Sequence, residues 1–161
     1  MRHVAHGRDP LDRPEPPEDS RWQRGFVVDA LYLADDVTTM WAEWYRHLAE
    51  GGLPPLAQLP RDVWRFRVDA PPVADLRGEP ELARVGLTLP SPGRPTWRAF
   101  QRIGETLWRE GWRGLLAPSA ARPNGRILCL FTAAHGPRVA EPIPPRTVVR
   151  EPPSPPAGMR T

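Results

Sequence analysis

Hydrophobic and polar positions recur along the chain with the periods of strands and helices. Residues 26–34 are mostly apolar and partly β-branched, which predicts a strand. Asp35 and Asp36 follow as good N-cap residues. An apolar stripe then recurs every three or four positions, at Val37, Met40, Trp41, Trp44 and Leu48. This spacing predicts an amphipathic helix that runs to about Glu50 and stops at the pair Gly51-Gly52.

The same rules predict the remaining elements. Residues 63–68 alternate as a half-exposed strand, with Trp64, Phe66 and Val68 on one face and Arg65 and Arg67 on the other. A short helix is predicted over 80–87. A long helix is predicted over 97–110, begun by Thr96 and ended by Gly111, with Phe100, Ile103, Leu107 and Trp108 toward the core. Two more strands are predicted over 114–117 and 126–132. This irregular order of elements indicates an α+β fold.

Proline divides the chain into parts. The 23 prolines crowd residues 10–17, recur between 54 and 95, and fill the end of the sequence from Pro137. Proline interrupts helix and sheet interiors, so the long regular elements are expected where it is missing. A length of 161 residues suits one domain. We therefore predict a domain over residues 1–136 and a Pro-rich, disordered tail over 137–161.

The charge of the chain does not change these predictions of fold and domain. Arginine supplies all 22 basic residues, but these are spread along the chain among 19 acidic ones, for a net charge of +3. A nucleic-acid-binding face would require clustering, so direct nucleic-acid binding is not expected. Residues 1–20 are charged and proline-rich, and the sequence contains no apolar run of 18 residues. The sequence therefore predicts no signal peptide and no membrane span, and a cytoplasmic location.

Thiol and metal chemistry are also not expected. Cys129 is the only cysteine and lies in an apolar run, which is typical of a small buried hydrophobic residue. The four histidines are scattered, at His3, His6, His47 and His135. Glu43 and His47 could share one helix face, but no third ligand accompanies them. We expect no metal site.

Four polar residues stand where chemistry is possible. Tyr32 lies in the first strand, Glu43 lies beside the apolar stripe of the helix, Ser119 follows a strand, and Arg21 is next to Trp22. An arginine beside an aromatic residue, with a carboxylate and a hydroxyl, could bind a phosphorylated ribose. Ordinary structural roles stay open from spacing alone. Glu43 in particular could form a surface ion pair with Arg46 or His47.

These residues, in their order and spacing, resemble the RES domain family, which is named for an Arg, a Glu and a Ser. The similarity runs through Arg21-Trp22-Gln23, residues 31–34 (LYLA) and residues 38–43 (TTMWAE). It resumes at residues 111–120 (GWRGLLAPSA) and ends at 128–131 (LCLF). The resemblance covers roughly residues 1–132.

The resemblance implies an ADP-ribosyltransferase-like fold and a toxin of a toxin–antitoxin pair that destroys NAD⁺ by hydrolysis or phosphorolysis. NAD⁺ would be the substrate, no cofactor would be needed, and a helix-turn-helix antitoxin would be the partner. Arg21 would bind phosphate, and Tyr32 would contact the nicotinamide riboside. Glu43 would stabilise the cationic sugar, and Ser119 would hold the ribose or orient Glu43. Arg2 would be a second substrate-binding arginine.

Some positions depart from the family pattern. Asp19-Ser20 stands where the family usually has Gly-Gly, and Gln23 replaces Asn. Met1 precedes Arg2, where the family has an aromatic residue. If the first strand is truncated, activity would be impaired. Two interpretations therefore stay open, an NAD⁺-degrading enzyme and a non-catalytic RES-like protein that binds a ligand or a partner.

Overall fold

Two β-sheets form the scaffold of the computed structural model, which describes residues 1–69, 72–132 and 139–161. The three-stranded sheet has the order β1-β3-β7 and consists of β1 (Arg2–Ala5), β3 (Arg61–Val68) and β7 (Ala140–Val149). The four-stranded sheet has the order β2-β6-β5-β4 and consists of β2 (Ala30–Ala34), β6 (Arg126–Phe131), β5 (Gly114–Pro118) and β4 (Ala74–Asp75). The β4–β5 pair is parallel, and the other pairs are antiparallel.

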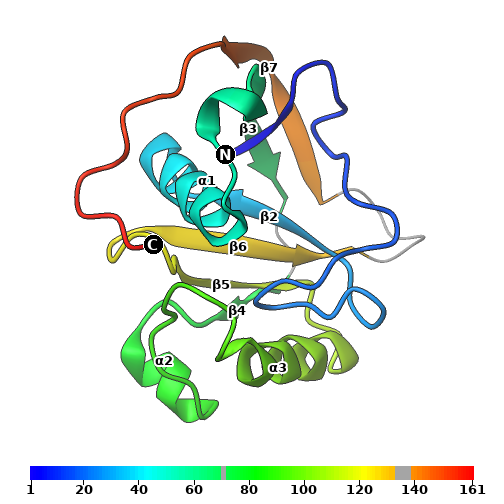
Figure 1. Cartoon of the computed structure of the whole chain (residues 1–161). Coiled ribbons are helices and arrows are strands. Elements are labelled where there is room, and N and C mark those ends of the chain that lie inside the picture. Colours follow the sequence, from blue (N-terminus) through cyan, green and yellow to red (C-terminus); the bar gives the residue numbers. More distant parts are fainter. Residues whose placement is uncertain (70–71, 133–138) are drawn as a thin grey trace.

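The helices lie on opposite sides of the four-stranded sheet. Helix α1 (Val37–Gly51) lies on the side that faces the three-stranded sheet, whereas α2 (Glu79–Arg84) and α3 (Trp97–Arg109) lie on the other side (Figure 1). A short 3₁₀ helix, η1 (Pro55–Gln58), leads into β3. The mixed α+β architecture expected from the sequence is present.

Alternating side chains of β2 and β6 bury both faces of the four-stranded sheet. Ala30 and Tyr32, with Cys129 and Phe131, face the core formed with α3. Leu31, Leu33 and Leu130 face the three-stranded sheet, where they pack with Phe66, Val68 and Ala140. A third cluster joins the apolar stripe of α1 to Ala34 and Val63. These central strands are therefore buried on both sides.

Helix α1 follows the prediction closely. The Asp36 side chain accepts a hydrogen bond from the Thr39 N–H, and Gly52 ends the helix with a φ of 61°. That left-handed conformation suits glycine. The predicted stripe is buried except for Val37, which is 44% exposed in the first turn.

Other predicted bounds shift for local reasons. The strand predicted over 26–34 begins only at Ala30, because the Val27 and Val28 N–H groups donate to the Arg24 carbonyl in a turn. Phe26 is 81% exposed in that turn. The short helix ends at Arg84 instead of residue 87. The long helix begins after Thr96, but the Thr96 side chain makes no capping hydrogen bond.

The disordered tail predicted over 137–161 is wrong for Ala140–Val149, which forms β7 and pairs with β3. The sheet order leaves β7 at an edge, where proline is tolerated because one side of the strand needs no partner. Arg146 also reaches the fully buried Asp62 of β3, with 3.4 Å between Nε and Oδ2. The domain boundary predicted at residue 136 and His135 both lie in 133–138, outside the described residues. No helix in the described ranges has the length and apolar composition needed to cross a bilayer.

Candidate functional site

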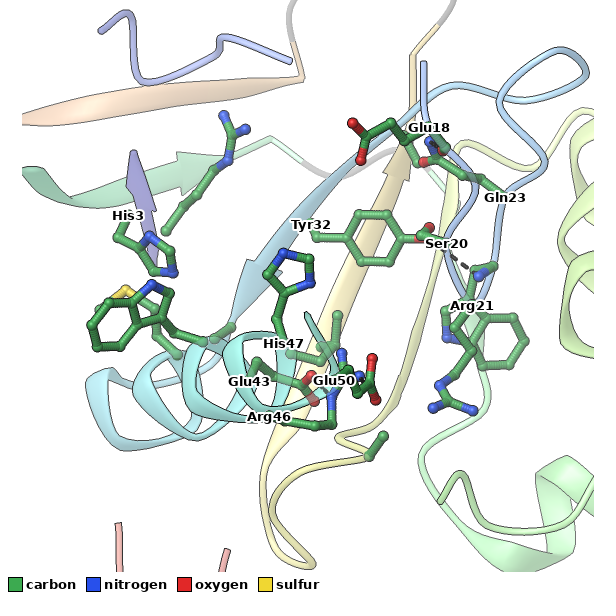
Figure 2. Close-up of a pocket in the computed structure, with 18 of the residues that line it drawn as sticks. His3, Glu18, Ser20, Arg21, Gln23, Tyr32, Glu43, Arg46, His47 and Glu50 are labelled. Atoms are coloured by element: carbon green, nitrogen blue, oxygen red, sulfur yellow. Dashed lines mark hydrogen bonds and ion pairs between the residues drawn. The ribbon is translucent and has the colours of Figure 1, made fainter. Parts of the chain in front are cut away.

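A cavity of about 580 Å³ contains most of the predicted site residues on its walls. Most of its lining comes from the N-terminal segment with β1, the loop over 13–23, strand β2 and helix α1, and β3 and the segment before α3 add Arg61 and Arg94. Figure 2 shows Tyr32 between the side chains of α1 and the loop that carries Ser20 and Arg21. Of the predicted residues, Arg2, Arg21, Tyr32 and Glu43 line the cavity.

The Glu43 carboxylate is held on both oxygens. Its Oε1 accepts hydrogen bonds from Ser119 Oγ at 2.6 Å and from the Ala121 N–H at 3.3 Å. Its Oε2 accepts from Arg46 Nε at 2.9 Å. The side chain of Glu43 is only 22% exposed. The carboxylate therefore has a fixed orientation at the cavity wall.

Ser119 lies behind Glu43 and does not line the cavity. It is fully buried in the loop between β5 and β6. Its Oγ accepts from the N–H groups of Ala121 and Arg122, at 3.1 and 3.0 Å. Because these donors occupy the lone pairs of the hydroxyl, its own proton is directed to Glu43. Of the two roles that the resemblance implied, this geometry favours the orientation of Glu43.

Arg46 belongs to the site but was not predicted as a site residue. It joins the carboxylates of Glu43 and Glu50 on one face of α1. Although burial opposes the effect, these two carboxylates raise the pKa of Arg46. The spacings i,i+3 and i,i+4 on a predicted helix are the sequence signal that could have identified this network. The expected surface pair of Glu43 with Arg46 is thus present, within the site.

Tyr32 ties β2 to the turn over residues 20–23. Its hydroxyl shares a short hydrogen bond with Ser20 Oγ and accepts from the Trp22 N–H at 3.2 Å. Burial raises the pKa of Tyr32 well above its usual value, so the phenol stays protonated. Tyr32 therefore contributes an aromatic face to the cavity and fixes the turn next to Arg21.

Helix α3 also contacts the turn over residues 20–23 and holds it in place. Gln101 Nε2 donates to the carbonyls of Ser20 and Gln23, at 3.0 and 3.2 Å. Gly104 lets the backbone approach closely, since a Cβ at this position would lie 2.1 Å from the Trp22 carbonyl oxygen. Neither residue was expected to support the site, because both lie in a helix that the sequence assigns only to the core.

Arg21 is 8% exposed and is held by the segment before α3. Its Nη2 donates to the Ser91 carbonyl at 2.6 Å, and its Nη1 lies 3.5 Å from Thr96 Oγ1. Its guanidinium also lies over the Phe100 ring, 5.2 Å from the centroid. Burial, and then the charge of Arg46, lower the pKa of Arg21 to about 10, so it stays charged at neutral pH. A guanidinium has five N–H donors, and these contacts use two of them.

Arg2 lines the cavity from β1. It donates from Nη1 to the Pro10 carbonyl at 2.5 Å and from Nη2 to the Asp12 carbonyl, which anchors the N-terminal loop. Burial, and then the charge of Arg13, lower the pKa of Arg2 to about 10.

His3 is a further cavity residue that the sequence did not single out for function. Its Nδ1 accepts from Arg61, at 3.1 Å from Nε and 2.8 Å from Nη2. Its ring stacks on Trp41 with 5.4 Å between centroids. Burial, and then the charges of Arg61 and Arg2, lower the pKa of His3 to about 3. The imidazole is therefore neutral at physiological pH.

The cavity is lined by six arginines and by five acidic residues, Glu18, Asp19, Asp29, Glu43 and Glu50. Its arginines are Arg2, Arg13, Arg21, Arg46, Arg61 and Arg94. Such a lining suits a ligand with several negatively charged oxygens, because guanidinium groups bind phosphate in a bidentate manner. In the described part of the chain, no group of three or more His, Cys, Asp or Glu residues is arranged to hold a metal ion. The arginines and the oriented Glu43 carboxylate together suit the binding of an anionic ligand beside a fixed negative charge.

Comparisons with known proteins agree with this architecture. The chain is similar to a chain in the crystal structure of the M. tuberculosis MbcT–MbcA toxin–antitoxin complex, with a TM-score of 0.72 and 19% identity. The match covers 91% of this chain and 81% of that chain, and it supports the ADP-ribosyltransferase-like fold that was expected. No curated protein matches the sequence. Residues 2–153 match the RES domain, which is nearly the whole sequence, and the chain therefore belongs to the RES domain family.

Proposed function

We propose that this RES protein is a toxin that degrades NAD⁺ by cleaving the N-glycosidic bond between nicotinamide and ribose. The observation that carries the proposal is the Glu43 carboxylate, which Ser119 and Arg46 orient at the wall of an arginine-lined cavity. The family membership and the similarity to a structure of a toxin–antitoxin complex support the same function.

Departure of nicotinamide leaves positive charge on the anomeric carbon of the ribose. A carboxylate held nearby stabilises that charge, and a fixed orientation avoids reorganisation during the reaction. Oε2 of Glu43 makes one hydrogen bond, to Arg46, which leaves it a lone pair for the sugar or its hydroxyl groups. Nicotinamide leaves with the electron pair of the broken bond. Water or phosphate forms the new bond to the anomeric carbon from the open face, and an attacking water loses one proton to the solvent.

Arginines would hold the pyrophosphate of NAD⁺. Arg21 and Arg2 are the predicted pair, and Arg13 and Arg61, whose charges act on Arg2, also line the cavity. Tyr32 offers its ring to the nicotinamide riboside. The similar structure is that of a toxin–antitoxin complex, which supports an antitoxin as the partner. The family resemblance implies that this antitoxin is a helix-turn-helix protein.

The test is incubation of the purified protein with NAD⁺, with and without phosphate, and analysis of the products by mass. Nicotinamide should appear in both cases. Water would yield ADP-ribose, and phosphate would yield ADP-ribose with a phosphate on the anomeric carbon. Glu43→Gln should lower turnover by about 10²- to 10³-fold, and Glu110→Gln, an exposed position after α3, is the matched control. Folded wild-type protein that leaves NAD⁺ intact would instead support the non-catalytic interpretation.

In cells, induction of the wild-type protein should stop growth and lower the NAD⁺ content, and Glu43→Gln should abolish both effects. Growth arrest with an unchanged NAD⁺ content would contradict the proposed substrate.

A further inference from the structure

Residues after the family match return to the loop that carries Ser119. The match ends at residue 153, where the Pro153 carbonyl accepts a hydrogen bond from the Tyr45 hydroxyl. From there the chain continues along the molecule to a point beside the loop between β5 and β6 (Figure 1, red). There Arg160 makes two contacts. Its backbone N–H donates to the Ala121 carbonyl at 2.7 Å, and its Nη2 donates to the Ser119 carbonyl at 3.1 Å.

These carbonyls belong to the two loop residues that hold Glu43. The Ser119 hydroxyl and the Ala121 N–H both donate to Glu43 Oε1. Arg160 thus binds the carbonyl groups of the same residues whose donors face the carboxylate. A displacement of this part of the loop would move both donors together.

A second set of contacts holds the loop through Arg122 and Gly125. Arg122 Nη1 contacts both oxygens of Asp36, at 2.8 and 3.1 Å, and Thr39 Oγ1 at 2.9 Å. Gly125 packs so closely on Thr39 that a Cβ would lie 2.6 Å from its Oγ1. These contacts fix the loop to the first turn of α1, whereas Glu43 lies further along the helix. At Ser119 itself the backbone N–H donates to the Gly125 carbonyl at 2.8 Å, and Arg160 adds a side-chain contact to the Ser119 carbonyl.

We propose that Arg160 is a positioning residue, which keeps the Ser119 hydroxyl and the Ala121 N–H directed at Glu43. Its effect on catalysis rests on the proposed function. Without the guanidinium, the loop gains freedom and the carboxylate is held less firmly at Oε1, although Arg46 still binds Oε2. The rate of bond cleavage then falls, while NAD⁺ binding by the arginines elsewhere in the cavity is retained.

The experiment compares Arg160→Ala with the wild type and with Arg150→Ala, an exposed arginine just after β7 that serves as the matched control. In Arg160→Ala, kcat for NAD⁺ should fall on the order of tenfold, the rate equivalent of one charge-assisted hydrogen bond. KM should stay within about twofold, because ground-state binding is not changed. Arg160→Lys should recover part of kcat, since an ammonium can still donate to the Ser119 carbonyl.

A second readout does not depend on activity. Amide hydrogen exchange at Ala121 and Arg122 should become faster in Arg160→Ala but not in Arg150→Ala, because these N–H groups lose their fixed acceptors. Should Arg160→Ala fail to fold, Arg160→Met keeps the backbone contact and much of the side-chain stem, and the same readouts apply. Unchanged kcat, a change in KM alone, or unchanged exchange at both amides would each overturn the role of Arg160. If the wild type does not degrade NAD⁺, the proposed function fails, whereas hydrogen exchange still decides whether Arg160 holds the loop.

Discussion

The Ser119 hydroxyl and the Glu43 carboxylate lie 2.6 Å apart, although 76 positions separate the two residues in the sequence. The contact joins helix α1 to the loop between β5 and β6. Because the Ser119 oxygen already accepts from two backbone N–H groups, its proton has one direction, toward Glu43. Ser119 is therefore an orienting group for the carboxylate, and its hydroxyl is not arranged as a nucleophile.

Substitution Ser119→Ala should lower both activity and stability. Loss of the hydroxyl frees Glu43 Oε1 and leaves the Ala121 and Arg122 N–H groups without that acceptor. We expect kcat for NAD⁺ to fall about 10- to 100-fold and the free energy of unfolding to fall by about 1–3 kcal/mol. Turnover assays and urea unfolding measure the two effects. Ser154→Ala, at an exposed position, is the control, and a full-activity Ser119→Ala protein would show that Glu43 needs no orientation.

Substitution Tyr32→Phe should act mainly on substrate binding. The ring remains, but the Ser20 hydroxyl and the Trp22 N–H lose their shared partner, so the turn next to Arg21 loosens. We expect KM for NAD⁺ to rise by about 3- to 10-fold and kcat to change less. Tyr45→Phe also loses a hydrogen bond but lies outside the cavity lining, so its KM should match the wild type. Equal effects of both substitutions on KM would contradict a specific role for Tyr32.

The neutral His3 predicts a pH dependence of stability. Its pKa is about 3 in the folded protein, below the usual value of about 6.5 for histidine. Between pH 3 and pH 6.5, His3 therefore binds a proton in the unfolded chain but not in the folded protein. This stabilising contribution is present above pH 6.5 and is lost as the pH falls toward 3, by as much as about 1.4 kcal/mol per pH unit.

The measurement is urea unfolding of the wild type and His3→Gln at pH 7.5 and pH 5. His3→Gln should be the less stable protein at pH 7.5, because it loses the stacking on Trp41. The difference in the free energy of unfolding between the two proteins should be smaller at pH 5, because only the wild type loses the contribution of the neutral His3. If the difference in the free energy of unfolding is the same at both pH values, the neutral state of His3 is contradicted.

Substitution Gly104→Ala tests the close packing of α3 against the turn over residues 20–23. Alanine favours helix, yet the new Cβ would meet the Trp22 carbonyl oxygen at 2.1 Å, and this backbone atom cannot move alone. We expect the free energy of unfolding to fall by about 1–3 kcal/mol and KM for NAD⁺ to rise. In Gly51→Ala the nearest atom would be in the flexible Leu53 side chain, at 3.3 Å, so stability should be nearly unchanged. A more stable Gly104→Ala protein would contradict the close contact.

Local signals explain which elements could be predicted. Helix α1 combines an N-cap, a regular apolar stripe and a terminal glycine, and all three act within one segment. Strand β7 lacks such signals. Its prolines are compatible with a strand only at the edge of a sheet, and the position of β7 at that edge depends on the other strands. Strand β1 has four residues, of which two are charged or titratable, so its pairing with β3 depends on residues far along the chain.

The site could be predicted only in part for the same reason. Helical geometry placed Glu43 beside the apolar stripe, where an ion pair with Arg46 was the simple expectation, and that pair exists. The family resemblance supplied Ser119 as its second partner. The contact between His3 and Arg61 joins β1 to β3 across 58 positions, and no local sequence pattern predicts it. Gln101 supports the site from a helix whose periodicity indicates only core packing.

The long separation between Glu43 and Ser119 has a consequence during protein synthesis. Glu43 leaves the ribosome 76 residues before its orienting hydroxyl, and β3 can pair with β7 only when Val149 has followed. Sheets built from such distant pairings close late. A nascent chain therefore has no assembled site until the residues up to Val149 have been translated. Whatever activity the cavity carries, fragments that end before Ser119 should be harmless to the cell that makes them.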